Sequence, residues 1–344
     1  MMRVGVIGCG SIARLRHLVE YWANKNAEIV AVCDIDSSRA DEMAEKYGAK
    51  AFTNYEELLQ LDEVDAISVC LPNDLHAPVS IAALNAGKHV LCEKPMATTS
   101  EEAEEMIQVA RKNSRTLMIA HNQRFVASHQ KAKQLIESGE IGKIYSFRTS
   151  FGHRGPEKWS IDGRDSWFFN KDEAFIGALG DLGVHKTDLI RYLLGEVAEV
   201  GAFVETSAKE NTEVDDNAVA ILKMESGVIG TLAASWSYVT GGDNSTIIYG
   251  EKAILRLEDD PNYSLIVQYT NGEVVKYELD KIQTNEEGGQ TNSRVIDHFV
   301  HSVLHEKEPL ITGEEGKKSL DVVLAALASN ETKKIIDLRA VPVR

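Results

Sequence analysis

Hydrophobic and polar positions follow two different rhythms along the chain. Up to about residue 122, short apolar runs alternate with stretches that carry apolar residues at helical spacing. The runs predict strands at Arg3–Ile7, Glu28–Asp34, Ala66–Leu71, His89–Cys92 and Thr116–Ala120. The stretches between them predict helices at Ser11–Asn24, Ser38–Tyr47, Tyr55–Leu61, Ala77–Asn85 and Ser100–Lys112. This alternation indicates right-handed βαβ units in a doubly wound parallel sheet with helices on both faces.

After residue 122 the pattern becomes a succession of strands. Helices are expected at Val126–Ser138, Leu182–Leu194, Asn292–Leu304 and Gly313–Ser329, with a polar surface loop at Asp280–Gln290. Strands are expected at Lys143–Phe151, Val197–Ser207, Asn217–Met224, Val228–Tyr238, Ser245–Tyr249, Ala253–Glu258, Leu265–Thr270 and Glu273–Glu278. We therefore predict an α/β chain of two domains, 1–122 and 123–344. The second would be an α+β domain whose large, mostly antiparallel sheet has one open face, on which a homodimer or homotetramer could form.

Composition limits the kind of partner. The 344 residues include 37 Lys+Arg and 53 Asp+Glu, a net charge of −16. This acidic balance argues against nucleic acid or an anionic membrane as a partner, because both need clustered cations. No apolar run is long enough to span a membrane, and the first residues show no signal-peptide cleavage site. The four cysteines have no metal-site spacing, so we expect free thiols, no metal and a cytoplasmic protein.

A glycine-rich turn, Gly8-Cys9-Gly10-Ser11-Ile12-Ala13, joins the first strand to the first helix. Glycines at these positions let a pyrophosphate approach the backbone at a helix N-terminus. Asp34 ends the second strand, where a carboxylate binds the ribose hydroxyls of NAD and repels the 2′-phosphate of NADP. Ser37, Ser38 and Arg39 could instead clamp that phosphate, although we expect Arg39 to pack on the adenine. NAD is the expected cofactor, and NADP stays possible.

Three further strand ends carry polar residues: Pro72-Asn73-Asp74-Leu75-His76, Glu93-Lys94-Pro95 and His121-Asn122-Gln123-Arg124. Ligands bind at the carboxyl ends of strands in doubly wound sheets, so these loops are candidates for one site. Pro95 restricts the backbone of Lys94 to an extended conformation. A partly desolvated lysine there could exchange a proton with a reacting oxygen. The alternative is a surface lysine with a solvated ammonium group.

Asp181, His185 and Asp188 can share one face of the helix that follows Gly177-Ala178-Leu179-Gly180. Acid–base chemistry is the functional interpretation of this group. Zinc would need a third protein ligand that the spacing does not supply, and an ordinary ion pair is the other alternative.

Taken in order, these motifs resemble the glucose–fructose oxidoreductase/inositol dehydrogenase (Gfo/Idh/MocA) family. The resemblance implies an N-terminal Rossmann domain and NAD(P)-dependent hydride transfer at a hydroxyl or carbonyl carbon of a sugar, inositol or related polyol. It implies that Lys94 contacts the reacting oxygen, that His185 is the general base or acid, and that Asp181 binds substrate and orients both. The expected cofactor-binding residues are Gly8, Gly10, Ser11, Ile12, Asp34, Arg39, Leu71, Pro72, Asn73, His76, Glu93, Lys94 and Asn122. The family's Gly-Gly-Gly run before the aspartate is absent here.

Substrate identity is expected to depend on the loop at residues 153–176. Its Trp159 and Trp167, together with Arg124, are candidate substrate-binding residues beside Lys94, Asp181 and His185. The aromatic side chains could equally pack the loop onto the sheet. Two other functions remain open: a redox-neutral epimerase or glycosidase-type reaction on tightly bound NAD, and a non-catalytic NAD-binding regulator.

Overall fold

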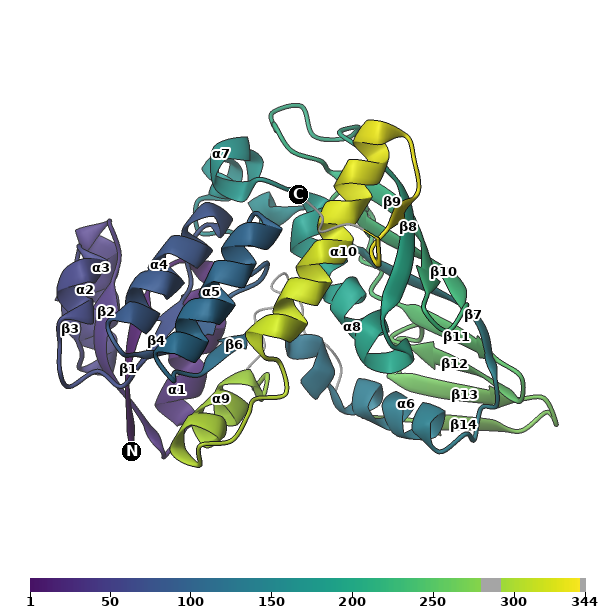
Figure 1. Ribbon diagram of the computed structural model, residues 1–344, viewed down its shortest axis with the longest axis horizontal. Coiled ribbons are helices and arrows are strands. Elements are labelled where there is room, and N and C mark those ends of the chain that lie inside the picture. Colours follow the sequence, from purple (N-terminus) through teal and green to yellow (C-terminus); the bar gives the residue numbers. More distant parts are fainter. Residues whose placement is uncertain (280–291, 341–344) are drawn as a thin grey trace.

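A computed structural model describes residues 1–279 and 292–340 as two sheet-based lobes with a long helix between them (Figure 1). The loop expected at Asp280–Gln290 lies outside these residues. The other expected elements can be compared directly with the structure. Within the described ranges, no helix has the length and apolar character needed to cross a membrane.

The N-terminal lobe is built on a six-stranded sheet in the order β3-β2-β1-β4-β5-β6, and its strand pairs are parallel. The strands are β1 Met2–Ile7, β2 Ala27–Cys33, β3 Lys50–Phe52, β4 Ala66–Val69, β5 His89–Cys92 and β6 Leu117–Ile119. The helices are η1 Ala13–His17, α1 Leu18–Ala23, α2 Ser37–Tyr47, α3 Tyr55–Leu59, α4 Asn73–Asn85 and α5 Ser100–Lys112. This is the strand order of a dinucleotide-binding doubly wound sheet, and it confirms the predicted fold class. Strand β3 was not predicted because its three residues are largely exposed and form no apolar run.

The C-terminal lobe contains a nine-stranded sheet in the order β14-β13-β12-β11-β7-β10-β9-β8-β15. Its strands are β7 Ile144–Gly152, β8 Val197–Glu205, β9 Asn217–Met224, β10 Ile229–Ser235, β11 Thr246–Gly250, β12 Ala253–Leu257, β13 Leu265–Tyr269, β14 Val274–Tyr277 and β15 Ile336–Asp337. The pairs are antiparallel except β7 with β10, which confirms the mostly antiparallel sheet. The two-residue β15 carries too short a pattern to be predicted.

Ten helical segments follow β6 in the described residues. They are η2 Asn122–Phe125, α6 Ala127–Glu137, η3 Pro156–Lys158, η4 Gly163–Asp165, η5 Trp167–Phe169, α7 Lys171–Ala174, η6 Leu179–Gly183, α8 Val184–Leu194, α9 Val295–Leu304 and α10 Gly313–Thr332. Figure 1 shows α10 running between the lobes, with α9 below the N-terminal sheet. Ser293, just before α9, donates its N–H to Glu20 Oε1 at 2.8 Å, and Thr312 forms a β-bridge with Met118. The end of the chain therefore contacts both lobes; the boundary at residue 122 stays a prediction.

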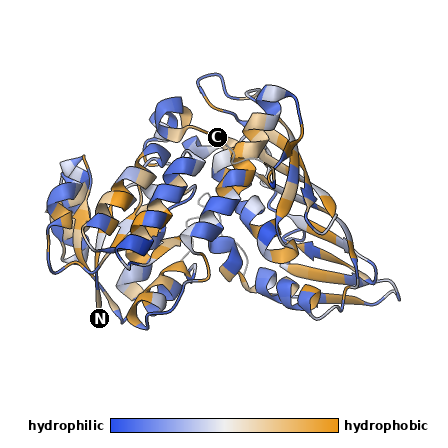
Figure 2. Cartoon of the chain, in the orientation of Figure 1, coloured by the Kyte–Doolittle hydropathy of each residue, from blue (hydrophilic) through white to orange (hydrophobic). Residues whose placement is uncertain are grey.

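Hydrophobic residues run along the strands of both sheets (Figure 2). In β9 they alternate: Ala218, Ala220, Leu222 and Met224 are buried, whereas Val219 and Ile221 are 47% and 61% exposed. Successive side chains of a strand point to opposite faces of the sheet. The buried residues of β9 therefore lie on the face that helices cover, and Val219 and Ile221 lie on the open face, where they form an exposed apolar surface.

Candidate active site

The glycine-rich turn lies where β1 meets the first helix. Gly8 has φ +94°, and a Cβ there would lie 2.2 Å from the carbonyl oxygen of Cys70, so only glycine fits. Gly10 has open space where its Cβ would be, and it lines a cavity of about 120 Å³. The N–H of Cys9 donates to Asp34 Oδ2 at 2.8 Å, which fixes the acidic end of β2 beside the turn. An accessible backbone at a helix N-terminus, flanked by this carboxylate, fits the pyrophosphate and ribose of NAD(P).

His76 and Asn73 hold the neighbouring loops in place. The His76 ring lies between two backbone carbonyls, with Nδ1 at 2.6 Å from Pro95 O and Nε2 at 2.9 Å from Leu71 O. Burial lowers the pKa of His76, which favours the neutral ring. The side chain of Asn73 donates to Ala174 O at 2.8 Å, at the end of the 153–176 loop. Both residues line the cavity, and their hydrogen bonds position the loops around it.

Lys94 and Asp181 form an ion pair at the wall of the cavity. Lys94 Nζ donates to Asp181 Oδ1 at 2.9 Å and to the Asp181 carbonyl at 3.0 Å. The other carboxylate oxygen accepts from the indole N–H of Trp236 at 3.2 Å. The two charged side chains are 13% and 6% exposed, so the pair is held in a largely water-excluded place. The Lys94–Pro95 peptide bond is cis.

Glu93 faces away from this pair, toward the first helix. Its Oε1 lies 2.8 Å from His17 Nε2, and His17 Nδ1 lies 2.9 Å from the hydroxyl of Ser68. Burial on its own would raise the pKa of Glu93, but the hydrogen bond and charge of His17, with Arg16 and Lys94, lower it to about 2. An ionised, anchored Glu93 fixes the strand end from which Lys94 projects.

His185 lies on α8 and lines the same cavity. Its Nδ1 is buried and has no hydrogen-bond partner among the described residues. Burial, followed by the charge of Lys94, lowers the pKa of His185 well below its usual value, so the ring is neutral at physiological pH. A neutral imidazole with a free nitrogen can accept a proton from a bound hydroxyl group.

Two other histidines behind the site are buried and neutral for the same reason. Burial lowers the pKa of His121 to about 4 and that of His129 to about 3. His129 Nδ1 contacts Gln123 O at 2.8 Å, so this ring holds the segment after β6.

Asp181 is placed by a tight helical entry. The carboxylate of Asp215 accepts the N–H groups of Gly177 and Leu179, each at 2.8 Å. Gly177 is required because a Cβ there would lie 1.8 Å from the Asp215 carbonyl oxygen. Burial raises the pKa of Asp215 to about 6 although both hydrogen bonds oppose that shift. This clamp sets the direction of η6 and therefore the position of Asp181.

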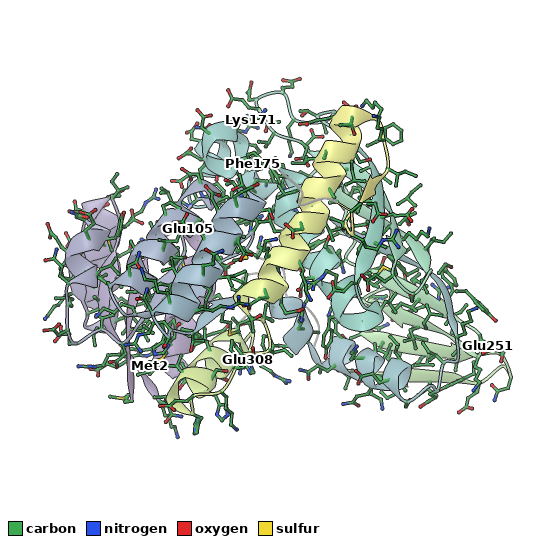
Figure 3. The ribbon with its side chains drawn as sticks, in the orientation of Figure 1. Met2, Glu105, Lys171, Phe175, Glu251 and Glu308 are labelled. Atoms are coloured by element: carbon green, nitrogen blue, oxygen red, sulfur yellow. The ribbon has the colours of Figure 1, made fainter. Side chains whose placement is uncertain are left out.

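The 153–176 loop closes the cavity from the C-terminal lobe. Trp159, Trp167 and Phe168 line it, and the rings of Trp167 and Phe168 stack with centroids 3.9 Å apart. In Figure 3, Lys171 marks the start of α7 and Phe175 directly follows this short helix, which lies above α4 in this view. The loop aromatics therefore pack on one another and also face the cavity, so the two interpretations of them do not exclude each other.

The cavity brings together most of the residues that the sequence singled out. Its lining includes Gly10, Ser11, Ile12, Leu71, Asn73, His76, Glu93, Lys94, Asn122, Trp159, Trp167, Asp181 and His185. Four of the expected cofactor residues, Gly8, Asp34, Arg39 and Pro72, are not in this lining.

Arg124 requires a correction. Its guanidinium is buried and binds the Asp188 carboxylate with three contacts of 2.7–3.1 Å, and it also contacts Glu315 Oε2 at 2.9 Å. Arg124 does not line the cavity, so its position does not support a role in substrate binding. Asp188 Oδ1 also accepts from the hydroxyl of Ser319 on α10 at 3.1 Å. The sequence could not show this, because Glu315 lies 191 residues away from Arg124.

Trp236, Arg16 and Asp162 are the main residues that the sequence reasoning missed. Trp236 is fully buried and its indole N–H binds the carboxylate of Asp181. In the sequence, its position at the end of a strand was the sole signal of a place near the site. Arg16 lines the cavity from the first helix, and Asp162 lines it from the loop. Neither belongs to a motif of regular spacing.

Comparisons with known proteins give the family. Residues 2–121 match the family described as "Oxidoreductase family, NAD-binding Rossmann fold", and residues 129–256 match the GFO/IDH/MocA C-terminal domain. The chain is 28% identical to myo-inositol 2-dehydrogenase of Thermotoga maritima, over 99% of each protein. It is 36% identical to dTDP-3,4-didehydro-2,6-dideoxy-alpha-D-glucose 3-reductase of Actinomadura kijaniata, over 67% of each.

A solved structure has the same fold over nearly the whole chain. The aldose-aldose oxidoreductase of Caulobacter crescentus, in a complex with glycerol, superposes with a TM-score of 0.83 at 26% identity, covering 98% of this chain and 99% of that one. The predicted resemblance is confirmed. With its parallel N-terminal sheet, accessible glycine turn and matched domains, the chain belongs to the Gfo/Idh/MocA family of NAD(P)-binding oxidoreductases.

Proposed function

We propose that this oxidoreductase transfers a hydride between NAD(P) and a secondary alcohol or carbonyl carbon of a cyclic sugar or polyol, with Lys94, Asp181 and His185 as its catalytic residues. The observation that supports this assignment is that one cavity is lined by Gly10 of the dinucleotide turn, by the Lys94–Asp181 pair and by neutral His185. NAD(P), when bound, supplies the hydride acceptor or donor.

The roles of the side chains follow from their charge. Lys94 donates a hydrogen bond to the reacting oxygen and stabilises its developing negative charge. His185 accepts the hydroxyl proton during oxidation and returns it during reduction, because its ring lines the cavity and burial keeps it neutral. Asp181 keeps the Lys94 ammonium directed into the cavity, since its Oδ1 accepts from Nζ and Trp236 fixes its other oxygen.

The substrate class rests on the lining and on the relatives. Trp159 and Trp167 offer flat apolar surfaces to the C–H faces of a sugar ring, while Asn122, Gln123 and His153 offer polar groups to its hydroxyls. The three relatives named above act, by their names, on an inositol, a deoxy-sugar and aldoses.

Turnover provides the test. The purified protein is incubated with NAD or NADP and a panel of inositols, aldoses, glycosides and acyclic or non-carbohydrate alcohols, and the absorbance of the reduced cofactor is followed. We expect turnover with at least one cyclic polyol or sugar, and its loss in Lys94→Ala. Turnover confined to acyclic or non-carbohydrate alcohols would refute the substrate class, while full activity of Lys94→Ala would refute the role of the lysine.

We also propose a homo-oligomer that forms through the open face of the nine-stranded sheet. Phe203, Val219, Ile221 and Ile229 are 72%, 47%, 61% and 54% exposed, and they lie on adjacent strands β8, β9 and β10. The register pairs Phe203 with Val219, Thr231 with Ile221 and Ile229 with Lys223, so the four apolar side chains share one open face with a threonine and a lysine among them. A surface of this kind indicates a protein partner, and a second copy satisfies it symmetrically. The cytoplasmic location stays a prediction.

A further inference from the structure

The 153–176 loop also contacts the N-terminal lobe, at the edge of the cavity near the glycine turn. The backbone N–H of Ile161 donates to Ser11 Oγ at 2.8 Å, on the dinucleotide turn. The next residue, Asp162, forms an ion pair with Arg39 at the start of α2. Arg39 follows Asp34, the residue expected to bind the adenosine ribose, by five positions. A carboxylate of the C-terminal lobe therefore lies at the adenosine end of the proposed cofactor site.

Arg39 is surrounded by negative charge. Its Nε lies 3.5 Å from Asp36 Oδ2, and its Nη2 binds Asp162. The hydrogen bond to Asp162 raises the pKa of Arg39 despite some desolvation, and the charges of Asp162, Asp34 and Asp36 act in the same direction. Three carboxylates thus act on one guanidinium.

The second guanidinium near the turn is also occupied. Arg14 Nε donates to the Cys9 carbonyl at 2.7 Å, and its Nη1 pairs with Glu42 at 2.7 Å. Both guanidinium groups are therefore already paired with carboxylates, although Arg14 Nη2 is buried without a hydrogen-bond partner among the described residues. Neither presents an unpaired positive charge to an incoming anion. A phosphate monoester such as the 2′-phosphate of NADP carries between one and two negative charges at neutral pH, and it needs such a cation.

We propose that Asp162 determines cofactor specificity: by pairing with Arg39 across the lobes it withholds the guanidinium from the 2′-phosphate of NADP, and the site selects NAD. The inference rests on the proposed function, since it assumes that the dinucleotide binds at the glycine turn. Asp162 would then be a second residue, besides Asp34, that favours NAD over NADP. It lies on the same loop as Trp159 and Trp167. Cofactor choice and the position of the substrate loop are therefore linked through one ion pair.

Binding provides the test, independently of turnover. Isothermal titration with NADH and NADPH is carried out on the wild type, on Asp162→Asn and on Asp165→Asn. Asp165 is an exposed carboxylate of the same loop, so its replacement makes the same change in net charge away from Arg39. We expect Asp162→Asn to improve the affinity for NADPH relative to NADH by about tenfold, the effect of one unit charge removed from a few ångströms away in a partly solvated site.

The control variant should leave the NADPH-to-NADH ratio unchanged. The double variant Asp162→Asn/Arg39→Ala should lose the gain, because the freed guanidinium is what binds the phosphate. An unchanged ratio in Asp162→Asn, an equal gain in Asp165→Asn, or a gain that survives removal of Arg39 would overturn the proposal. A wild type that binds neither dinucleotide would instead overturn the proposed function, so the two failures are distinguishable.

Discussion

Replacing Lys94 with alanine removes the cation from a pair that is largely shielded from water. Lys94 Nζ and Asp181 Oδ1 are 2.9 Å apart, and their side chains are 13% and 6% exposed. At an effective dielectric constant of about 20, the attraction across this distance is about 6 kcal/mol, of which desolvation offsets a large part. Alanine leaves the Asp181 carboxylate with Trp236 as its remaining side-chain donor. We therefore expect Lys94→Ala to lower the free energy of unfolding by about 2–3 kcal/mol.

The same replacement should remove activity for a separate reason. The reacting oxygen loses its hydrogen-bond donor, so kcat/KM should fall by about 10²–10⁴-fold.

Two further variants separate the effect on stability from the effect on activity. Lys94→Arg keeps a positive charge beside Asp181 and should recover much of the stability, but arginine does not release a proton and its fork fits differently, so activity should stay low.

Lys94→Ala/Asp181→Asn removes both charges and should be more stable than Lys94→Ala while remaining inactive. Urea unfolding gives the stabilities, and initial rates with the best substrate of the panel give the activities. Two results would refute the reasoning: an Asp181→Asn replacement that does not rescue the stability of Lys94→Ala, or a Lys94→Ala variant that keeps more than about a tenth of the activity.

Four other predictions concern the fold and its surfaces. Gly8→Ala should lower the melting temperature, whereas Gly10→Ala should fold normally yet bind NADH at least about tenfold more weakly. An equal fall in melting temperature for both variants would contradict these different roles of the two glycines. Burial lowers the pKa of His129 from 6.5 in the unfolded chain to about 3 in the folded protein, so the folded protein should lose stability as the pH falls between these values. The expected slope is about 1.4 kcal/mol per pH unit. His129→Gln should remove this slope from the free energy of unfolding measured with urea at several pH values. Arg124→Met should cost about 3 kcal/mol of stability with an unchanged KM for the sugar, and a raised KM would restore a substrate role. Ile221→Glu should dissociate the oligomer in sedimentation experiments, and an unchanged mass would place the interface elsewhere.

Local sequence patterns were sufficient where one segment determines its own structure. The doubly wound parallel sheet of the N-terminal lobe follows from alternating apolar runs and helices, and the glycine turn is recognisable from its glycine spacing between a strand and a helix. Lys94, Asp181 and His185 were found because each follows a predicted strand or begins a predicted helix. The doubly wound topology places only Lys94 at the carboxyl edge of the parallel sheet; Asp181 and His185 are brought to it by η6 and α8 of the other lobe.

Long-range pairing was not accessible in this way. Arg124 follows a strand end exactly as a site residue would, yet its partner Glu315 is contributed by a helix 191 residues later. The pairing of Arg39 with Asp162 likewise joins two lobes across 123 residues. An isolated charge in the sequence does not reveal whether its partner is a ligand or another side chain. Only the packing of α10 and of the 153–176 loop decides that.

In the proposed reaction, a hydride moves between a sugar or polyol carbon and the cofactor. Lys94 stabilises the reacting oxygen, and His185 accepts or returns its proton. The most direct measurement uses a substrate deuterated at the reacting carbon, with NAD, and mass spectrometry of the reduced cofactor. We expect one deuterium in each molecule of NADH formed and a rate slowed by the label. Product formation without net NADH would contradict this expectation and favour the redox-neutral reaction, and binding of NAD with no turnover across the panel would favour a regulator.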